Sequence, residues 1–152
     1  MDSRMIPDLE KIRAVFAADR FAAAAGIVID TVTEEAVECS MEITERHMNA
    51  GGTVQGGAIF TLADLTFAVH ANLPLLCGAP VGITVGQSNS ISFLSPPRGK
   101  RLIARSTCLT RGRSISVFRI AVQDETGRPV AEMFGNGFTK QAAETGTPPP
   151  TA

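Results

Sequence analysis

One long apolar segment, residues 51–72 (GGTVQGGAIFTLADLTFAVHAN), limits the possible folds more than any other feature of the sequence. From Gly56 onward its apolar side chains leave no wide polar face, so a helix here has to be buried nearly all round. A membrane span is a poor fit, because the run of about 17 residues is short and contains Asp64 and His70. The segment therefore predicts the central helix of a globular core.

Asp64 is the one acidic residue in this segment and the first candidate for a functional role. A buried carboxylate is unfavourable unless it is paired, hydrogen-bonded or protonated. Two interpretations therefore remain open: a reactive acid, or a structural acid that is satisfied by a neighbouring hydroxyl or by a subunit contact.

The glycines ahead of the helix favour the reactive acid. Gly51, Gly52, Gly56 and Gly57 allow a sharp turn that exposes backbone N–H groups at the helix start, where negative charge is stabilised. Such amides can form an oxyanion hole. Gly56 and Asp64 are separated by roughly 12 Å along a helix, too far to meet on one carbonyl. Two antiparallel copies of the helix would bring the Gly56 amide of one chain to Asp64 of the other, with two sites per dimer.

Composition limits the class of protein. A chain of 152 residues with 44% hydrophobic content fits one domain. The net charge of −1 and the absence of Trp and Tyr give no sign of a nucleic-acid surface. Three widely spaced cysteines and two histidines indicate neither a disulfide framework nor a metal site. The charged N-terminus lacks a signal-peptide core, so reduced thiols and a cytoplasmic location are expected.

The remaining segments read as short helices and strands. Ahead of the central helix we expect two helices and two strands, over residues 7–20, 21–26, 27–33 and 36–43. After it we expect a loop over 73–80 and four strands, over residues 81–94, 101–110, 114–123 and 130–140. The separators SPPRGK, RGR and DETGRP carry turn residues, so the four strands are predicted to form an antiparallel meander.

One fully buried helix beside six strands predicts an α+β hotdog fold, in which a curved antiparallel sheet wraps around the helix. The predicted domain organisation is an N-terminal amphipathic helix over residues 1–20, the hotdog domain over 21–140, and a disordered tail over 141–152. A second chain would close the open sheet edge and the uncovered side of the helix. The phenylalanines expected in the core are Phe93, Phe118, Phe134 and Phe138.

The motifs HMNAGGTVQGGAIFTLAD at residues 47–64 and ISFLSPP at 91–97 resemble those of the PaaI-like acyl-CoA thioesterases, a family of the hotdog superfamily. The resemblance covers residues 26–139. It implies hydrolysis of an acyl-CoA thioester to a free acid and CoA by homodimers that pair into homotetramers. No metal is required, and CoA enters only as part of the substrate.

The resemblance also implies roles for single residues. Asp64 matches the catalytic carboxylate, a general base or a nucleophile, and Gly56 matches the glycine whose N–H polarises the carbonyl. Asn49 matches an asparagine that orients water or substrate from the partner chain. Gln55 stands where most members have His; its amide can donate a hydrogen bond but cannot titrate.

Further residues are expected around the substrate. Phe60 and Phe67 would supply a dry slot for the acyl group, beside the amide of Gly57. Thr84 or Ser88 would replace a hydroxyl that some relatives place near the carboxylate. Basic residues at two strand junctions are candidates to bind the phosphates of CoA, although for each one taken singly a solvated loop residue is the stronger interpretation: Arg98, Lys100, Arg101, Arg111 and Arg113.

Three functions are therefore weighed. An acyl-CoA thioesterase is the main hypothesis, and a non-catalytic acyl-CoA-binding or regulatory protein is the alternative that Gln55 favours. A hydratase or dehydratase normally needs a His with the acid, and the matching position has none. His70 lies six residues beyond Asp64 on another face, so it is expected to be a satisfied helix-end histidine.

Overall fold

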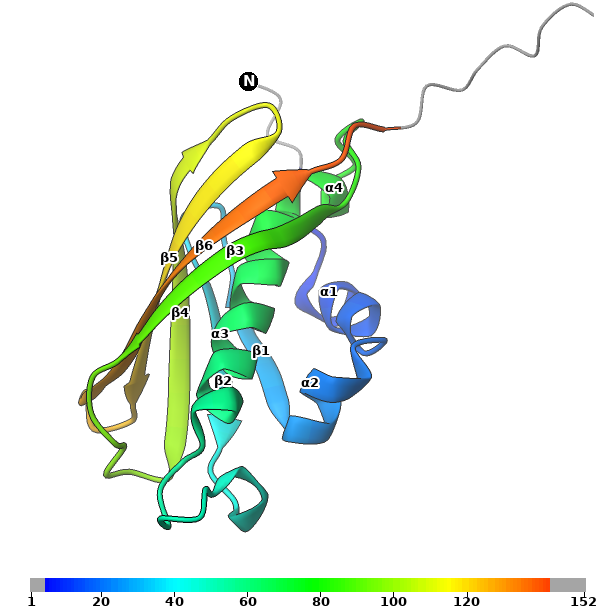
Figure 1. The fold of residues 1–152 in the computed structure, drawn as a ribbon. Helices are drawn as coiled ribbons and strands as arrows, with labels where there is room; N and C mark the ends of the chain where they lie inside the picture. The colour runs from blue at the N-terminus through cyan, green and yellow to red at the C-terminus, as the bar shows by residue number, and fades with distance from the viewer. Residues whose placement is uncertain (1–4, 143–152) are drawn as a thin grey trace, which may run out of the picture.

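A curved antiparallel sheet of six strands wraps around one long helix in the computed structural model, which describes residues 5–142 (Figure 1). The helices are α1 (Leu9–Phe16), α2 (Arg20–Ala25), α3 (Gly56–Ala71) and α4 (Leu73–Leu76), with a short 3-10 turn η1 (Glu45–His47). The strands are β1 (Ile27–Val32), β2 (Val37–Glu42), β3 (Thr84–Phe93), β4 (Arg101–Arg111), β5 (Ile115–Asp124) and β6 (Pro129–Thr139). The α+β hotdog prediction is confirmed. Residues 143–152 of the predicted tail lie outside the described residues.

The strand order is β1-β2-β4-β5-β6-β3. Strands β4, β5 and β6 form the predicted meander, but the prediction was wrong for β3, which pairs with β6 instead of β4. The connection from β3 to β4 contains Pro96 and Pro97, which have no N–H to donate to a ladder. It passes the start of β6, where the Arg128 side chain donates to the Pro96 carbonyl at 2.9 Å. Strands β1 and β3 are therefore the two edges of the sheet.

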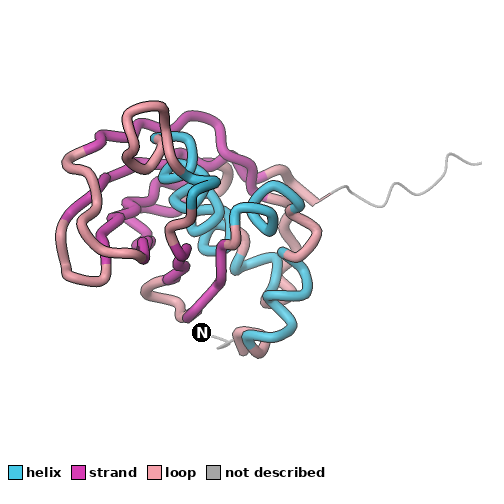
Figure 2. The backbone as a smooth tube through the Cα atoms, turned by 90° about the horizontal axis from the view of Figure 1, so that it is seen from below, coloured by secondary structure: helices cyan, strands magenta, loops and turns pink. Residues whose placement is uncertain are grey.

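The core lies between α3 and the concave face of the sheet, on which the helices gather (Figure 2). Apolar side chains from both layers are fully buried, among them Val37, Met41, Leu62, Phe118 and Ile120. Close packing of these side chains holds α3 along the sheet. No helix of the described residues is long and apolar enough to cross a bilayer.

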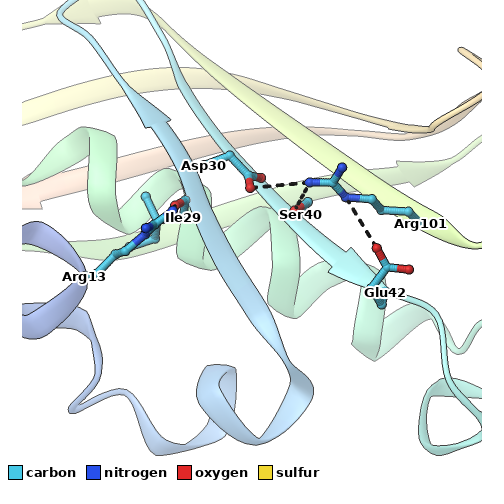
Figure 3. A network of polar contacts seen from close by, with 6 residues as sticks. All are labelled: Arg13, Ile29, Asp30, Ser40, Glu42 and Arg101. Carbon is cyan, nitrogen blue, oxygen red and sulfur yellow. Dashed lines mark hydrogen bonds and ion pairs between the residues drawn. The ribbon is translucent and has the colours of Figure 1, made fainter. Parts of the chain in front are cut away.

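The two N-terminal helices begin at aspartate caps. The side chain of Asp8 accepts from the Lys11 amide at the start of α1, and Asp19 caps α2, which ends at Gly26 in the left-handed conformation (φ 79°). Arg13 of α1 donates to the Ile29 carbonyl of β1 at 2.7 and 2.9 Å (Figure 3). This contact joins α1 to the edge of the sheet.

Two expectations about the core and the loops were wrong. The segment 73–80 is not all loop, since its apolar start forms the single turn of α4. Of the four phenylalanines placed in the core, Phe118 alone is buried, whereas Phe93, Phe134 and Phe138 are 54%, 44% and 40% exposed. On β6 the glycines at 135 and 137 face α3, so the alternation of a strand turns Phe134 and Phe138 to the outer face.

Candidate functional site

The loop ahead of α3 is held by the side chain of Asn49. Its Oδ1 accepts from the amides of Gly51 and Thr53 at 2.9 and 3.1 Å, and its Nδ2 donates to the Thr53 hydroxyl at 3.0 Å. Gly52 supplies the positive φ of 80° that the turn requires. Asn49 therefore shapes the loop in this chain, and its predicted role toward water or substrate stays a prediction.

The start of α3 presents backbone amides that its own turns do not use. The first bonds of the helix run from the Ala58 and Ile59 amides to the Gln55 carbonyl, so the amides of Gly56 and Gly57 precede this ladder. The Gln55 side chain does not cap the helix; it folds back over the first turn. A Cβ at position 57 would lie 2.5 Å from Gln55 Oε1, so a larger residue there would displace the end of the Gln55 side chain. The arrangement fits a site for developing negative charge.

Gly56 has a packing role as well. A Cβ at this position would lie 3.0 Å from the ring of Phe93, at the end of the edge strand β3. The lack of a side chain thus lets Phe93 cover the helix start.

Asp64 lies on the side of α3 that the sheet leaves uncovered, between the buried residues Ala63 and Leu65. The carboxylate is partly buried. Burial raises the pKa of Asp64 above its ordinary value, and the negative charge of Asp19, at the start of α2, raises it further. A carboxyl with a raised pKa at an open helix face is typical of an acid–base group.

Residues 51–131 match the family model of the thioesterase superfamily, which covers the glycine loop, α3 and Asp64. The chain belongs to this superfamily.

Two curated relatives and one solved structure extend the match. Acyl-coenzyme A thioesterase 13 of Homo sapiens is 30% identical over 129 residues, 81% of this chain and 87% of that protein. Acyl-coenzyme A thioesterase PaaI of Escherichia coli is 27% identical over 138 residues, 90% and 94% of the two chains. A thioesterase from Haemophilus influenzae shares the fold, with a TM-score of 0.83 and 22% identity. The match covers 97% of this chain and 100% of that protein. The resemblance to PaaI-like hotdog thioesterases and the prediction of a thioester hydrolase are confirmed.

The apolar residues predicted for the acyl slot differ in exposure in this thioesterase. Phe67 is 2% exposed and packs edge-on against Phe118, with ring centroids 5.5 Å apart. Phe60 is half-buried, one helical turn before Asp64. Phe67 is thus part of the core of a single chain, and Phe60 lies closer to its surface.

The two hydroxyl candidates have partners away from Asp64. The Thr84 hydroxyl lies 2.8 Å from that of Thr139, and the Thr84 amide donates to Asn72 at 2.8 Å. Ser88 accepts from Asn136 at 2.9 Å on the outer face of the sheet. In the single chain neither hydroxyl has a hydrogen bond to Asp64, and a role for Thr84 or Ser88 at the site stays a prediction.

The predicted phosphate-binding arginines are spread over the molecule. Arg111 donates to the carbonyls of Ala71 and His70 at 3.1 and 3.2 Å and lies over the ring of Phe118, so it caps the end of α3. Arg98 and Arg113 are exposed near strand ends. Arg101 bonds Ser40 and pairs with two carboxylates, Asp30 and Glu42 (Figure 3). A role in binding CoA stays a prediction for Arg98, Arg111 and Arg113.

Both histidines of the thioesterase are structural. His70 is buried, with its ring nitrogens 3.1 Å from the Ser106 hydroxyl and 3.3 Å from the Glu34 carbonyl, as expected for a satisfied helix-end histidine. Burial lowers its pKa, which favours the neutral ring. His47 accepts from the Thr44 amide and bonds the Ala25 carbonyl. Residues 5–142 contain no cluster of three or more His, Cys, Asp or Glu suited to a metal ion.

Sequence reasoning missed the contribution of α2 to the site. Asp19 caps that helix and also acts on the charge of Asp64. Phe21, Ala24 and Ala25 line a cavity against the start of α3. Asp19 ahead of a helical segment was a visible cap signal, but nothing in the sequence placed α2 beside Asp64.

Proposed function

We propose that this thioesterase hydrolyses acyl-CoA thioesters between two subunits. Asp64 of one chain acts as general base or nucleophile, and the Gly56 amide of its partner polarises the thioester carbonyl. The observation that carries the proposal is the pairing of an open, partly buried carboxyl of raised pKa with unused amides at the start of the same helix. The relatives named as acyl-coenzyme A thioesterases support the substrate class.

The geometry of α3 explains why two chains are needed. Eight residues separate Gly56 from Asp64, roughly 12 Å of helix, so one chain cannot place both groups on one carbonyl. The uncovered side of α3 at Asp64 and the free edge of β3 are surfaces that a second copy would cover. A two-fold axis there would generate two equivalent sites.

In the proposed reaction the residues have separate tasks. The Gly56 amide and the helix dipole stabilise the negative charge that develops on the carbonyl oxygen. Asp64 either takes a proton from an attacking water or attacks the carbonyl carbon itself. Gln55 donates a hydrogen bond to the substrate or the water, and it does not change charge.

Asp64→Asn tests the proposal, because it removes the base and keeps the shape. We expect kcat/KM for acyl-CoA substrates to fall by about 10²–10⁴-fold with the fold unchanged, measured by thiol release and circular dichroism. Glu35→Gln, at an exposed turn between β1 and β2, is the matched control and should keep full activity. Full activity in a folded Asp64→Asn variant would remove Asp64 from the mechanism. Acyl-CoA binding without turnover in the wild type would favour the non-catalytic alternative.

A further inference from the structure

An open cavity of about 660 Å³ lies between α2 and the first turns of α3. Figure 1 shows α2 beside the N-terminal half of α3. Most of the lining is small or apolar, from Phe21, Ala24 and Ala25 of α2 and from Gly57 and Ala58 of α3. Its volume is within the range of about 300–1,000 Å³ that is usual for small-molecule sites.

The cavity borders the helix positions next to the groups proposed for catalysis. Gln55 and Gly57 line it at the start of α3, and Thr61 lines it one turn further on. Asp64 follows Thr61 by three residues, about 4.5 Å along the helix and on the same side. A ligand in the cavity therefore lies along the helix face that joins the oxyanion amides to the carboxylate.

Two polar side chains of the lining, the half-buried Thr61 and the buried His47, already have partners. The Thr61 hydroxyl donates to the Gly57 carbonyl at 2.7 Å. The His47 ring bonds the Ala25 carbonyl at 2.8 Å and the Thr44 amide at 3.0 Å. Away from the helix start, where Gln55 and the Gly57 amide lie, the lining therefore offers few free partners to an occupant that needs hydrogen bonds, such as the two amides of a pantetheine arm. The other polar lining residues, Arg46 and Gln55, are exposed.

We propose that this cavity is the acyl pocket of the thioesterase and that it takes an apolar medium-chain acyl group. The assignment rests on the proposed function. The volume favours a chain over a single ring, because an apolar cavity of about 150 Å³ suffices for benzene. Phe21, 75% exposed in the single chain, supplies an apolar surface that the acyl chain covers.

Substitution of one alanine on α2 separates the two sides of this helix. Ala24 lines the acyl pocket. Ala23, also exposed and on the same helix, lines a different cavity, formed mainly by α1 and β1 with Leu65 of α3. Ala24→Phe should lower kcat/KM for octanoyl-CoA by about tenfold or more and leave acetyl-CoA within about threefold. Ala23→Phe should keep the wild-type profile. Phe21→Ala, a second change at the surface, should also lower kcat/KM for octanoyl-CoA more than for acetyl-CoA.

A binding measurement separates this pocket from the proposed reaction. The thioether S-octyl-CoA cannot be hydrolysed, and it should bind the wild type more tightly than S-ethyl-CoA and lose that advantage in Ala24→Phe. If no acyl-CoA is hydrolysed but this advantage is seen, the proposed function fails and the pocket stands. If hydrolysis occurs and Ala24→Phe lowers all chain lengths equally, or acts no differently from Ala23→Phe, the pocket is refuted.

Discussion

Gly135→Ala tests how tightly β6 packs on the central helix. A Cβ at this position would lie 2.9 Å from Phe67 Cδ2 and 3.1 Å from Asn89 Oδ1. The Phe67 ring has no room to retreat, because it is 2% exposed and its other side meets Phe118. Forcing a methyl group into a close-packed core costs about 1–3 kcal/mol, and we expect a loss of unfolding free energy in this range.

The measurement is urea unfolding at a fixed protomer concentration, because subunit association adds to the apparent stability. A thermal midpoint should fall by roughly 2–4 °C for each kcal/mol. Gly86→Ala is the control, since its Cβ would lie 3.6 Å from the same Phe67 ring, an ordinary contact. Gly86→Ala should be neutral, or should stabilise the protein by about 0.4–1 kcal/mol because alanine lowers the conformational entropy of the unfolded chain. Equal losses in both variants, or none in Gly135→Ala, would refute the packing argument.

Three other changes test charge and hydrogen bonding. Asp19→Asn keeps a helix cap but removes a negative charge, which is the second cause, after burial, of the raised pKa of Asp64. The acid limb of the pH profile of kcat/KM should therefore move to lower pH. An unmoved limb would contradict this. Gln55→His should keep or raise turnover, whereas a collapse would show that the amide has its own role. The hydrogen bond from the Thr126 hydroxyl, with smaller contributions from backbone amides, holds the pKa of Asp124 well below its ordinary value. The stabilisation that the Asp124 carboxylate provides is therefore complete above about pH 4 and lost as pH falls further. Asp124→Asn should lower the urea midpoint at pH 7 and weaken the dependence of this midpoint on acid pH. An unchanged midpoint would contradict this.

Much of the fold was predictable because local patterns determine it. The apolar run of α3 and the alternation in β2 state which faces are buried, and the glycine at 26 marks the end of α2. The position of β3 was not predictable from such patterns, because periodicity shows that a strand exists but not which strand it pairs with. Pairing of β3 with β6 depends on contacts between residues that are far apart in the sequence, from 38 residues for Phe93 with Ala131 to 55 residues for Thr84 with Thr139.

The candidate site divides in the same way. Asp64 and the glycines could be found from the sequence, since an acid in an apolar helix and glycines at its start are unusual for chemical reasons. The contacts of Arg111 could not be predicted from the sequence, because a basic residue in a strand gives the same pattern whether it binds phosphate or packs on the end of α3. The proposed acyl pocket was not predictable from the sequence either, because Ala24 and Ala25 line a cavity only when α2 lies against α3.

The open side of α3 determines how the carboxyl of Asp64 would behave in the proposed dimer. A second chain would remove more water from Asp64, which raises its pKa further. The same chain would bring the start of its own α3, whose unused Gly56 amide and dipole favour the charged carboxylate and lower the pKa. These effects oppose each other, so the dimer can exclude water from the site and still keep the carboxylate ionised. A thioester that enters the proposed site would then meet a base that is dehydrated but charged.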